Sequence, residues 1–371
     1  MIYFDNAAST KPHKEAVLAL NKVLTESYAN PSSLHRGGIE AEKIINSAKK
    51  TILSRLPSGG RLIFTSGGTE SNNLALFGLR EPKDYRQRKI ITTTIEHPSV
   101  SEPLTELEMH GVTGDTHTSV LRLTPEKGQS FEDRIISAVD QDVFLISVMA
   151  VNNETGFIID TPKIYEAVKQ RFPSCIVHTD AAQAFMKIPV DGDLISLSAH
   201  KIHGVKGAGG LYMRENVRMA PRIRGGGQQD GLRSGTEPTE LIAAFGAAVG
   251  NFTYEHKHFT ELSERLTQLL ENFDGVNYRL NSRNSLPSII NFSVKGVKSE
   301  ILLHYLAEND IFVSSGSACA RSNRSKSLLA FGVSEKDVDS SLRLSFSNEN
   351  TTDEVEKFAA ILKAGIERFR R

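Results

Sequence analysis

Two charged residues that could hold a reactive cofactor stand at the ends of neighbouring apolar runs. Asp180 follows the run at residues 175–177, and Lys201 follows the run at residues 193–197. A lysine amine can form a Schiff base with an aldehyde, and a carboxylate can pair with a protonated pyridine nitrogen. The pair therefore suggests pyridoxal phosphate (PLP) chemistry on Lys201. Most acids and lysines at strand ends are solvated turn residues, so this hypothesis depends on the residues around the pair.

Other polar groups also follow strands that the sequence predicts. Gly68 and Thr69 lie between a predicted strand and a helix predicted to begin at Leu74, an arrangement that directs backbone N–H groups toward an anion such as a phosphate. His97 could stack over an aromatic ring or move protons, because imidazole titrates near neutrality. Asn152 could donate to a ring oxygen or to a substrate carboxylate. Taken alone, Gly68 and Thr69 are better explained as a plain strand-to-helix turn, Asn152 as an ordinary cap or turn residue, and His97 equally well as a polar loop residue.

The residues around Lys201 extend the hypothesis. Ser198 and His200 end the same apolar run, so a phosphate could collect both while Lys201 reaches an aldehyde carbon. His200 and His203 could instead suggest a metal pair, but no third ligand stands at a recognisable spacing, so we expect no metal. Arg343 lies on an alternating strand and could bind a carboxylate through two parallel hydrogen bonds. A solvent-exposed strand arginine is the ordinary alternative.

The two cysteines, Cys175 and Cys319, stand in opposite surroundings and cannot make a disulfide framework. Cys175 begins an apolar run and is expected to be a small core residue. Cys319 lies in a loop of small residues that is followed by Arg321, Arg324 and Lys326. Nearby cations favour the thiolate form, so Cys319 is the candidate nucleophile.

The composition of the 371-residue chain excludes several classes of function. Lysine plus arginine and aspartate plus glutamate both number 44, so no basic surface is expected to attract nucleic acid. The first residues lack a basic and apolar leader, and no apolar run approaches the length that spans a bilayer. We therefore expect a cytoplasmic protein that binds neither nucleic acid nor membrane.

Strands and helices alternate along most of the chain, which indicates an α/β fold with a mostly parallel sheet. The strands predicted in this part lie at residues 61–65, 89–95, 143–151, 175–177 and 193–197. Gly68, His97, Asn152, Asp180 and Lys201 each follow one of these strands, and the carboxyl edge of such a sheet is where ligands bind. Toward the end the pattern becomes mixed, with strands expected at 289–294 and 311–314 and a last helix at 352–369. We predict a large α/β domain at 13–251 and a smaller α+β domain at 252–371 that also includes residues 1–12.

A series of short motifs, in order from the first residues to the last strand, resembles the cysteine desulfurases of the NifS/IscS type. The motifs are Asp5-Asn6-Ala7-Ala8, Asn30-Pro31-Ser32-Ser33-Leu34-His35, Gly67-Gly68-Thr69-Glu70-Ser71-Asn72-Asn73, Glu96-His97-Pro98, Val151-Asn152-Asn153-Glu154-Thr155-Gly156, Asp180-Ala181-Ala182-Gln183, Ser198-Ala199-His200-Lys201, Arg233-Ser234-Gly235-Thr236, Ser314-Ser315-Gly316-Ser317-Ala318-Cys319 and Leu342-Arg343-Leu344-Ser345. Several are specific, and together they cover essentially the whole chain.

The resemblance implies a PLP-dependent transferase of fold type I, with a seven-stranded sheet in the large domain, that works as a homodimer. It implies conversion of L-cysteine to L-alanine, with the sulfur left on Cys319 as a persulfide. An acceptor protein would take that sulfur for iron–sulfur cluster, thio-tRNA or thiamin biosynthesis. The domain at 252–371 would carry the Cys319 loop.

The resemblance also implies a role for each matched residue. Lys201 would carry PLP, Asp180 would pair with the pyridine nitrogen, and Gln183 would contact the ring hydroxyl. His97 would stack on the ring and transfer protons. Gly68, Thr69, Ser198 and His200 would bind the phosphate, and Thr236 would contact the phosphate of the other subunit. Asn152 would lie beside the cofactor and, with Arg343, would orient the substrate carboxylate.

Some positions depart from the common pattern, and other functions stay open. Val205 stands where proline is usual and Ser347 where glycine is usual, while Asp230 follows Gln228-Gln229 where members of the family vary. None of these changes removes a catalytic group, but Ser347 and Asp230 leave the acceptor open. The alternatives are an aminotransferase, which would not need Cys319, a selenocysteine lyase of the same fold, and a PLP-free scaffold for sulfur transfer.

Overall fold

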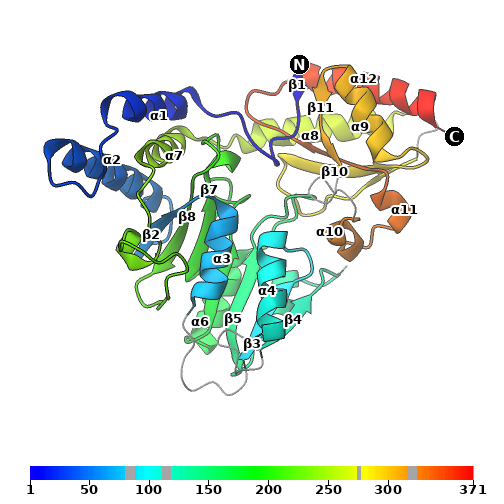
Figure 1. Ribbon diagram of the computed structural model, residues 1–371. Helices are drawn as coiled ribbons and strands as arrows, with labels where there is room; N and C mark the ends of the chain where they lie inside the picture. Colours follow the sequence, from blue (N-terminus) through cyan, green and yellow to red (C-terminus); the bar gives the residue numbers. More distant parts are fainter. Residues whose placement is uncertain (80–87, 111–117, 127, 274–276, 316–323, 371) are drawn as a thin grey trace.

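The central sheet of the protein has seven strands, as the computed structural model in Figure 1 shows. The structure describes residues 1–79, 88–110, 118–126, 128–273, 277–315 and 324–370. In spatial order the strands are β2 (Gly60–Thr65), β8 (Gly209–Arg214), β7 (Leu194–Ser198), β6 (Ile176–Asp180), β5 (Val143–Met149), β3 (Arg88–Thr93) and β4 (Thr118–Leu123). Within this sheet β8 alone runs opposite to the other strands. The predicted α/β fold with a mostly parallel sheet is therefore confirmed.

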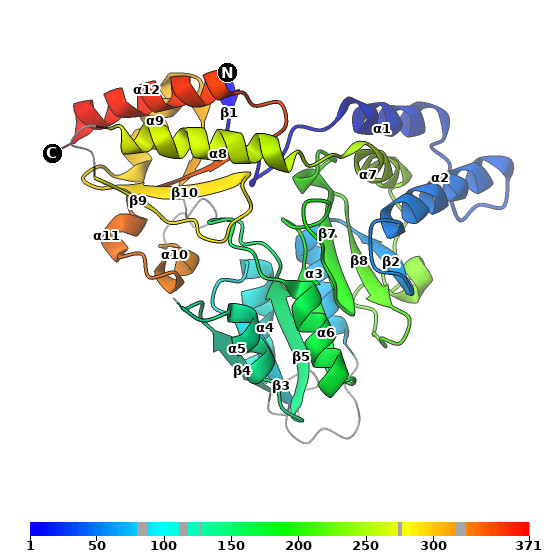
Figure 2. The ribbon, with the colours of Figure 1, turned by 180° about the vertical axis from the view of Figure 1, so that it is seen from behind.

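Helices cover both faces of this sheet. α3 and α4 lie on the face seen in Figure 1, and α5 and α6 lie on the face seen in Figure 2. The helices of this part of the chain are α1 (Lys14–Glu26), α2 (Arg36–Leu53), α3 (Gly68–Gly78), α4 (Pro98–His110), α5 (Phe131–Ser137), α6 (Thr161–Arg171) and α7 (Thr239–Asn251). With both faces covered, every residue of β5 is buried, which explains its continuous apolar run.

A second, smaller sheet packs against three helices from the last third of the chain. Its strands are β12 (Ser314–Ser315), β13 (Ser341–Ser345), β10 (Ile289–Val294) and β9 (Tyr278–Leu280), while β1 (Ile2–Tyr3) pairs with β11 (Ile311–Phe312). The packed helices are α8 (His256–Glu271), α9 (Ser299–Glu308) and α12 (Thr352–Phe369), and α10 (Lys326–Ala330) and α11 (Glu335–Val338) are short. A capping box formed by Thr351 and Glu354 starts α12.

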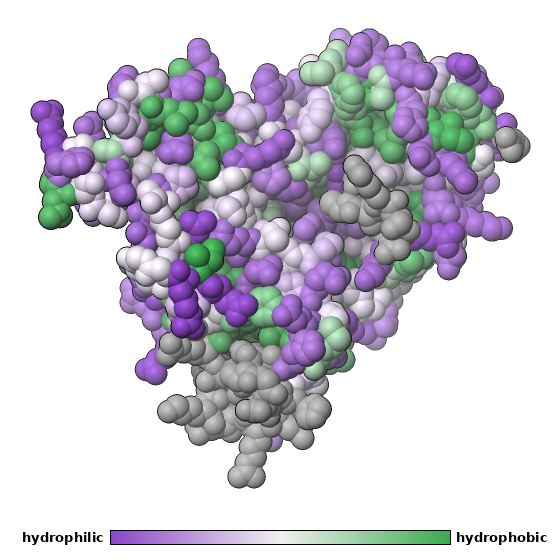
Figure 3. All heavy atoms as spheres, in the orientation of Figure 1, coloured by the Kyte–Doolittle hydropathy of each residue, from purple (hydrophilic) through white to green (hydrophobic). Residues whose placement is uncertain are grey.

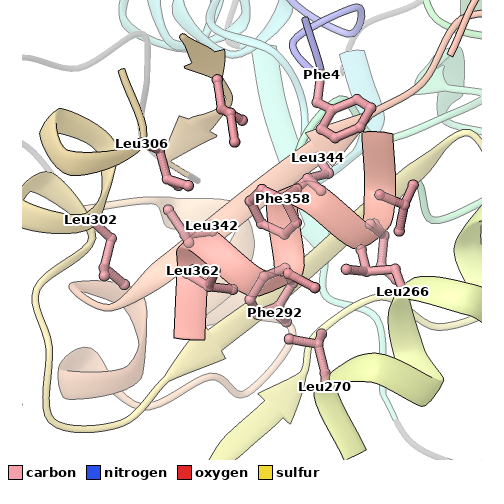
Figure 4. Close-up of a cluster of buried hydrophobic side chains, with 14 of the residues drawn as sticks. Phe4, Leu266, Leu270, Phe292, Leu302, Leu306, Leu342, Leu344, Phe358 and Leu362 are labelled. Atoms are coloured by element: carbon pink, nitrogen blue, oxygen red, sulfur yellow. The ribbon is translucent and has the colours of Figure 1, made fainter. Parts of the chain in front are cut away.

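One hydrophobic cluster fills the space under this smaller sheet. Phe292, Leu344 and Phe358 are fully buried in it, and Phe4 joins them from the start of the chain (Figure 4). The ring of Phe4 meets that of Phe358 edge to face, with centroids 6.0 Å apart. The predicted domain division at 13–251 and 252–371 stays a prediction, and this shared cluster supports joining residues 1–12 to the smaller part.

The structure differs from the sequence prediction in two elements near the functional residues. The strand expected at 311–314 is two short strands, because β11 pairs with β1 whereas β12 pairs with β13. The helix expected from Leu74 begins at Gly68. Its first turns carry buried polar side chains, including Ser71 and Asn72, so apolar periodicity does not mark them. Among the described residues, no helix combines the length and the apolar composition that crossing a bilayer requires.

Candidate active site

A pocket of about 300 Å³ opens at the carboxyl ends of the central strands, where β13 of the smaller sheet approaches them. Most of the predicted site residues line it. They are Gly68, Thr69, His97, Asp180, Gln183, Ser198, His200, Lys201 and Arg343. The fold therefore brings together side chains that lie far apart in the sequence, at the edge where open α/β sheets bind ligands.

Asp180 is the last residue of β6 and is almost fully buried. Its Oδ1 accepts a hydrogen bond from the backbone N–H of Ala182 at 2.9 Å. Its Oδ2 accepts one from the side-chain amide of Asn72, also at 2.9 Å. These two donors hold the carboxylate in one orientation on the pocket wall.

A chain of hydrogen bonds connects Asp180 to His97. The same Asn72 amide donates to the Ser99 hydroxyl at 2.8 Å, and that hydroxyl lies 2.8 Å from Nδ1 of His97. The backbone N–H of Ser99 donates to Nδ1 at 3.1 Å, so Nδ1 is an acceptor and the neutral ring carries its proton on Nε2. Burial lowers the pKa of His97, and Lys201 adds to this effect whereas Asp180 opposes it. His97 is therefore a neutral imidazole with Nε2–H as its available donor.

Lys201 ends a short 3₁₀ turn that follows β7. Its Nζ donates to the carbonyl oxygens of Ala7 at 2.6 Å and Ala8 at 2.9 Å. Nε2 of Gln183 donates to the same Ala7 carbonyl at 2.7 Å. Oε1 of Gln183 is buried and has no hydrogen-bond partner in the part of the chain that the structure describes. The first residues of the chain thus form one wall of the pocket and hold the amine of Lys201, the candidate catalytic group.

The other end of the pocket has the groups that an anion requires. Gly68 and Thr69 are the first residues of α3, and the N–H groups of a first helical turn have no partner within the helix. A Cβ placed on Gly68 would lie 3.6 Å from Cβ of Ser198, so the absence of a side chain leaves this corner open. Burial lowers the pKa of His200 to about 4, with a contribution from the charge of Lys201. His200 is thus a neutral hydrogen-bonding group here.

Arg343 reaches the pocket from β13 and is 4% exposed. One of its Nη atoms lies 2.5 Å from Oδ1 of Asp5, and the other donates to the carbonyl of Asn153 at 2.9 Å. Its Nε is buried, with no partner among the described residues. The guanidinium therefore keeps a donor for one more acceptor, such as a carboxylate.

Asn152, predicted to contact the cofactor and substrate, does not line this pocket. Its Oδ1 accepts from the backbone N–H groups of Glu154 at 3.0 Å and Thr155 at 2.9 Å, and its Nδ2 donates to the carbonyl of Ile95 at 3.1 Å. The fully buried side chain therefore holds its own loop together. The neighbouring Asn153 lines the pocket instead.

Three other predicted residues have separate outcomes. Thr236 is exposed and outside this pocket, on a segment that Arg233 ties to Glu70 of α3 through an ion pair of 2.9 Å. Cys319 lies outside the described residues, within 316–323. Cys175 is buried, and burial raises the pKa of its thiol to about 12, which confirms it as a core residue. Among the described residues, no cluster of three His, Cys, Asp or Glu side chains could hold a metal ion.

Several residues of the site carry no assigned role in the sequence analysis. Asn72 and Ser99 connect Asp180 with His97, Asp5 pairs with Arg343, and the carbonyls of Ala7 and Ala8 bind Lys201. Asn72, Asp5 and the two alanines fall within motifs shared with the resembled family, but nothing in the sequence indicates which atom each one contacts. Ser99 has no such signal.

Comparison with known proteins gives the same family along the chain. The family described as Aminotransferase class-V matches residues 2–358. The cysteine desulfurase IscS of Neisseria meningitidis serogroup C is 35% identical over 384 residues, covering 100% of this chain and 93% of the relative. Among solved structures, a NifS-like protein has a TM-score of 0.86 at 32% identity and 99% coverage of both chains. SspA in complex with cysteine has a TM-score of 0.79 at 34% identity, covering 93% of this chain and 99% of its own.

These matches cover 93–100% of the chain at 32–35% identity. The chain therefore belongs to the aminotransferase class-V family, among its NifS/IscS cysteine desulfurases.

Proposed function

We propose that this chain uses PLP, bound in the pocket around Lys201, to convert L-cysteine into L-alanine and to place the sulfur on Cys319. One observation carries the proposal: Lys201, Asp180 and His97 line a single pocket, and a hydrogen-bond chain connects the last two. The relative named as a cysteine desulfurase and the SspA structure in complex with cysteine support the same substrate.

The side chains in the pocket fit the ring of PLP. Asp180 offers a buried carboxylate, and an ionised acid in that position would keep a pyridine nitrogen protonated. Oε1 of Gln183 is a buried acceptor without a partner among the described residues, which suits the donating hydroxyl of the ring. Lys201 lies on the same pocket wall and would carry the aldehyde carbon.

The phosphate of PLP fits the corner at the start of α3. Gly68 and Thr69 would contribute their backbone N–H groups, and the helix dipole favours a negative charge there. Ser198 and His200 line the same pocket and would add neutral hydrogen bonds. Thr236 would reach the phosphate of the other subunit, in agreement with its exposed position on its own chain.

When bound, PLP supplies an electron sink for the Cα of an attached amino acid. Lys201 would take the Cα proton, and the carbonyls of Ala7 and Ala8 would stabilise the resulting ammonium group because they accept its N–H donors. His97 would move protons through Nε2, since Ser99 occupies Nδ1. Arg343 would orient the substrate carboxylate with its remaining donor.

The sulfur would leave the substrate by transfer to the Cys319 thiolate, and alanine would depart with a proton in its place. An acceptor protein would then take the terminal sulfur of the Cys319 persulfide. An iron–sulfur scaffold, a tRNA-thiolation enzyme and a thiamin-pathway protein all suit this chemistry, in a cytoplasmic setting. Incubating the persulfide-loaded protein with each candidate acceptor, and following labelled sulfur, separates them.

We also propose that the protein works as a homodimer. Large apolar side chains are exposed on α1 and on the segment that follows it: Leu18 by 55%, Leu24 by 52%, Tyr28 by 81% and Leu34 by 95%. Figure 3 shows hydrophobic patches over this part of the face. Such a concentration favours burial against another protein surface. Sedimentation equilibrium would measure a dimer mass, and a monomer mass at micromolar concentration would contradict this proposal.

The function is tested by absorbance and product analysis of matched variants. We expect the PLP-loaded protein to absorb visible light and to form alanine from cysteine. Lys201→Ala should lose the absorbance of the lysine-bound cofactor, whereas Lys206→Ala, which changes an exposed lysine nearby, should keep it. Cys319→Ser should keep the absorbance but form no persulfide. An aminotransferase would stay active in Cys319→Ser, a PLP-free scaffold would show no cofactor absorbance, and faster turnover of selenocysteine than of cysteine would indicate a lyase.

A further inference from the structure

The guanidinium of Arg343 already has a carboxylate partner within the chain. Asp5 lies 2.5 Å from one Nη atom and is 23% exposed at its side chain, against 4% for Arg343. The carbonyl of Asn153 accepts from the other Nη atom. An incoming α-carboxylate would therefore meet a guanidinium whose charge is already partly compensated.

The backbone around Asp5 holds this carboxylate in place. Asn6 donates through its side chain to the carbonyl of Ser345 at 2.9 Å, and the N–H of Ala7 donates to the Ser345 hydroxyl at 2.8 Å. Ser345 is two residues beyond Arg343 on the same strand, β13. Asp5 and Arg343 are thus fixed to one structural unit, and the ion pair between them does not depend on movement of the first residues.

A second acid near Arg343 is less able to compensate its charge. Burial raises the pKa of Glu154 to about 7, while Arg343 and Ser325 act in the opposite direction. Near neutral pH a substantial fraction of Glu154 is therefore protonated. In the part of the chain that the structure describes, Asp5 is the carboxylate in ion-pair contact with Arg343.

We propose that Asp5 sets the affinity of the active site for α-carboxylates by sharing Arg343 with the substrate. Two carboxylates at one guanidinium repel each other, so Asp5 weakens the binding of cysteine and also of alanine. The weaker hold on alanine helps the product to leave, because both molecules have the same α-carboxylate. The inference rests on the proposed role of Arg343 in orienting that group.

The test measures binding to the PLP-loaded protein through the change in cofactor absorbance, so that it does not depend on turnover. L-alanine is titrated alongside ethylamine, which lacks the carboxylate. In Asp5→Asn we expect the dissociation constant of L-alanine to fall about three- to tenfold, while that of ethylamine stays unchanged. The KM for L-cysteine should fall with it. An unchanged or higher dissociation constant for L-alanine overturns the inference, because a residue that only holds Arg343 in position would weaken binding when removed.

Control variants separate the possible causes. Asp5→Ser removes the same charge and should act in the same direction, which keeps the test valid if Asp5→Asn folds poorly. Asp310→Asn removes an exposed acid beside the β1–β11 pair without touching Arg343, and should change neither constant. If Arg343→Lys leaves L-alanine binding unchanged, the proposed role of Arg343 fails. If Arg343→Lys weakens L-alanine binding and the Asp5 variants do not tighten it, the inference about Asp5 alone fails.

Discussion

Glu154→Gln is expected to make the protein less sensitive to alkaline pH. Glu154 follows β5, and its Oε2 accepts a hydrogen bond from the Ser325 hydroxyl at 2.5 Å. Burial raises the pKa of Glu154 from 4.5 to about 7, and the hydrogen bond from Ser325 and the charge of Arg343 only partly oppose this. Glutamine keeps the shape and an acceptor oxygen but cannot ionise.

The size of the effect follows from proton linkage. Between pH 4.5 and about 7 the folded protein keeps the Glu154 proton while the unfolded chain loses it, so the free energy of unfolding falls as the pH rises. At about 1.4 kcal/mol per pH unit over about 2.5 pH units, the full loss amounts to about 3.5 kcal/mol and is complete by about pH 8. Below pH 4.5 both states are protonated and the loss is absent. Glu154→Gln lacks this pH-dependent loss of stability, because glutamine does not ionise.

Urea unfolding of the parent and of Glu154→Gln at pH 5 and pH 8.5 measures the effect. The free energy of unfolding of the variant, relative to the parent, should rise by about 2.5 kcal/mol between the two pH values, because part of the loss has already occurred at pH 5. Comparing the two proteins at the same pH cancels the contributions of other titrating groups to the free energy of unfolding. One such group is Glu96, whose pKa burial raises to about 8. Glu349→Gln, at an exposed ion pair with Lys11, should show no such rise. A difference that changes by less than about 0.5 kcal/mol would refute the reasoning.

Three further expectations concern buried groups. Asp193 is fully buried, accepts from the N–H of Val177 at 2.8 Å and pairs with Lys169 at 2.6 Å, so Asp193→Ala should cost about 3–5 kcal/mol in urea unfolding. A cost below about 1 kcal/mol would contradict this role. Burial raises the pKa of Cys175 to about 12, so iodoacetamide at pH 8 should leave this thiol unmodified in the folded protein and modify it in urea. Peptide masses would measure the labelling, and equal labelling in both conditions would argue against burial. Phe358→Ala should cost about 3–5 kcal/mol in the same unfolding assay, and a near-neutral result would mean that the cluster repacks.

Elements with a clear apolar period could be predicted closely from the sequence. The helix at Thr352–Phe369 and the strand at Ile289–Val294 have the predicted limits. The sequence does not indicate β8, because this strand begins with Gly209 and Gly210, residues that commonly mark turns. In the structure these glycines allow close packing, since a Cβ on Gly209 would lie 2.5 Å from Cα of Gly67.

The site could be predicted as a set of residues but not as a set of contacts. Motifs and strand ends placed Asp180, His97 and Lys201 in one pocket, and the structure brings them together. The sequence does not show that the Asn152 side chain bonds within its own loop instead of facing the pocket, because this depends on which backbone N–H groups surround its amide. The connection through Asn72 depends likewise on where α3 begins.

The first residues of the chain connect the Lys201 side of this pocket to the Arg343 side. Ala7 and Ala8 hold Lys201, whereas Asp5 holds Arg343, and these three residues lie within a stretch of four positions. That segment is fixed in turn by Ser345 on β13. The distance between the amine and the guanidinium is therefore set by a short piece of backbone rather than by the packing of the two sheets alone. Any change that loosens this segment should disturb proton transfer and carboxylate binding together, whereas a change at His97 should affect proton transfer alone.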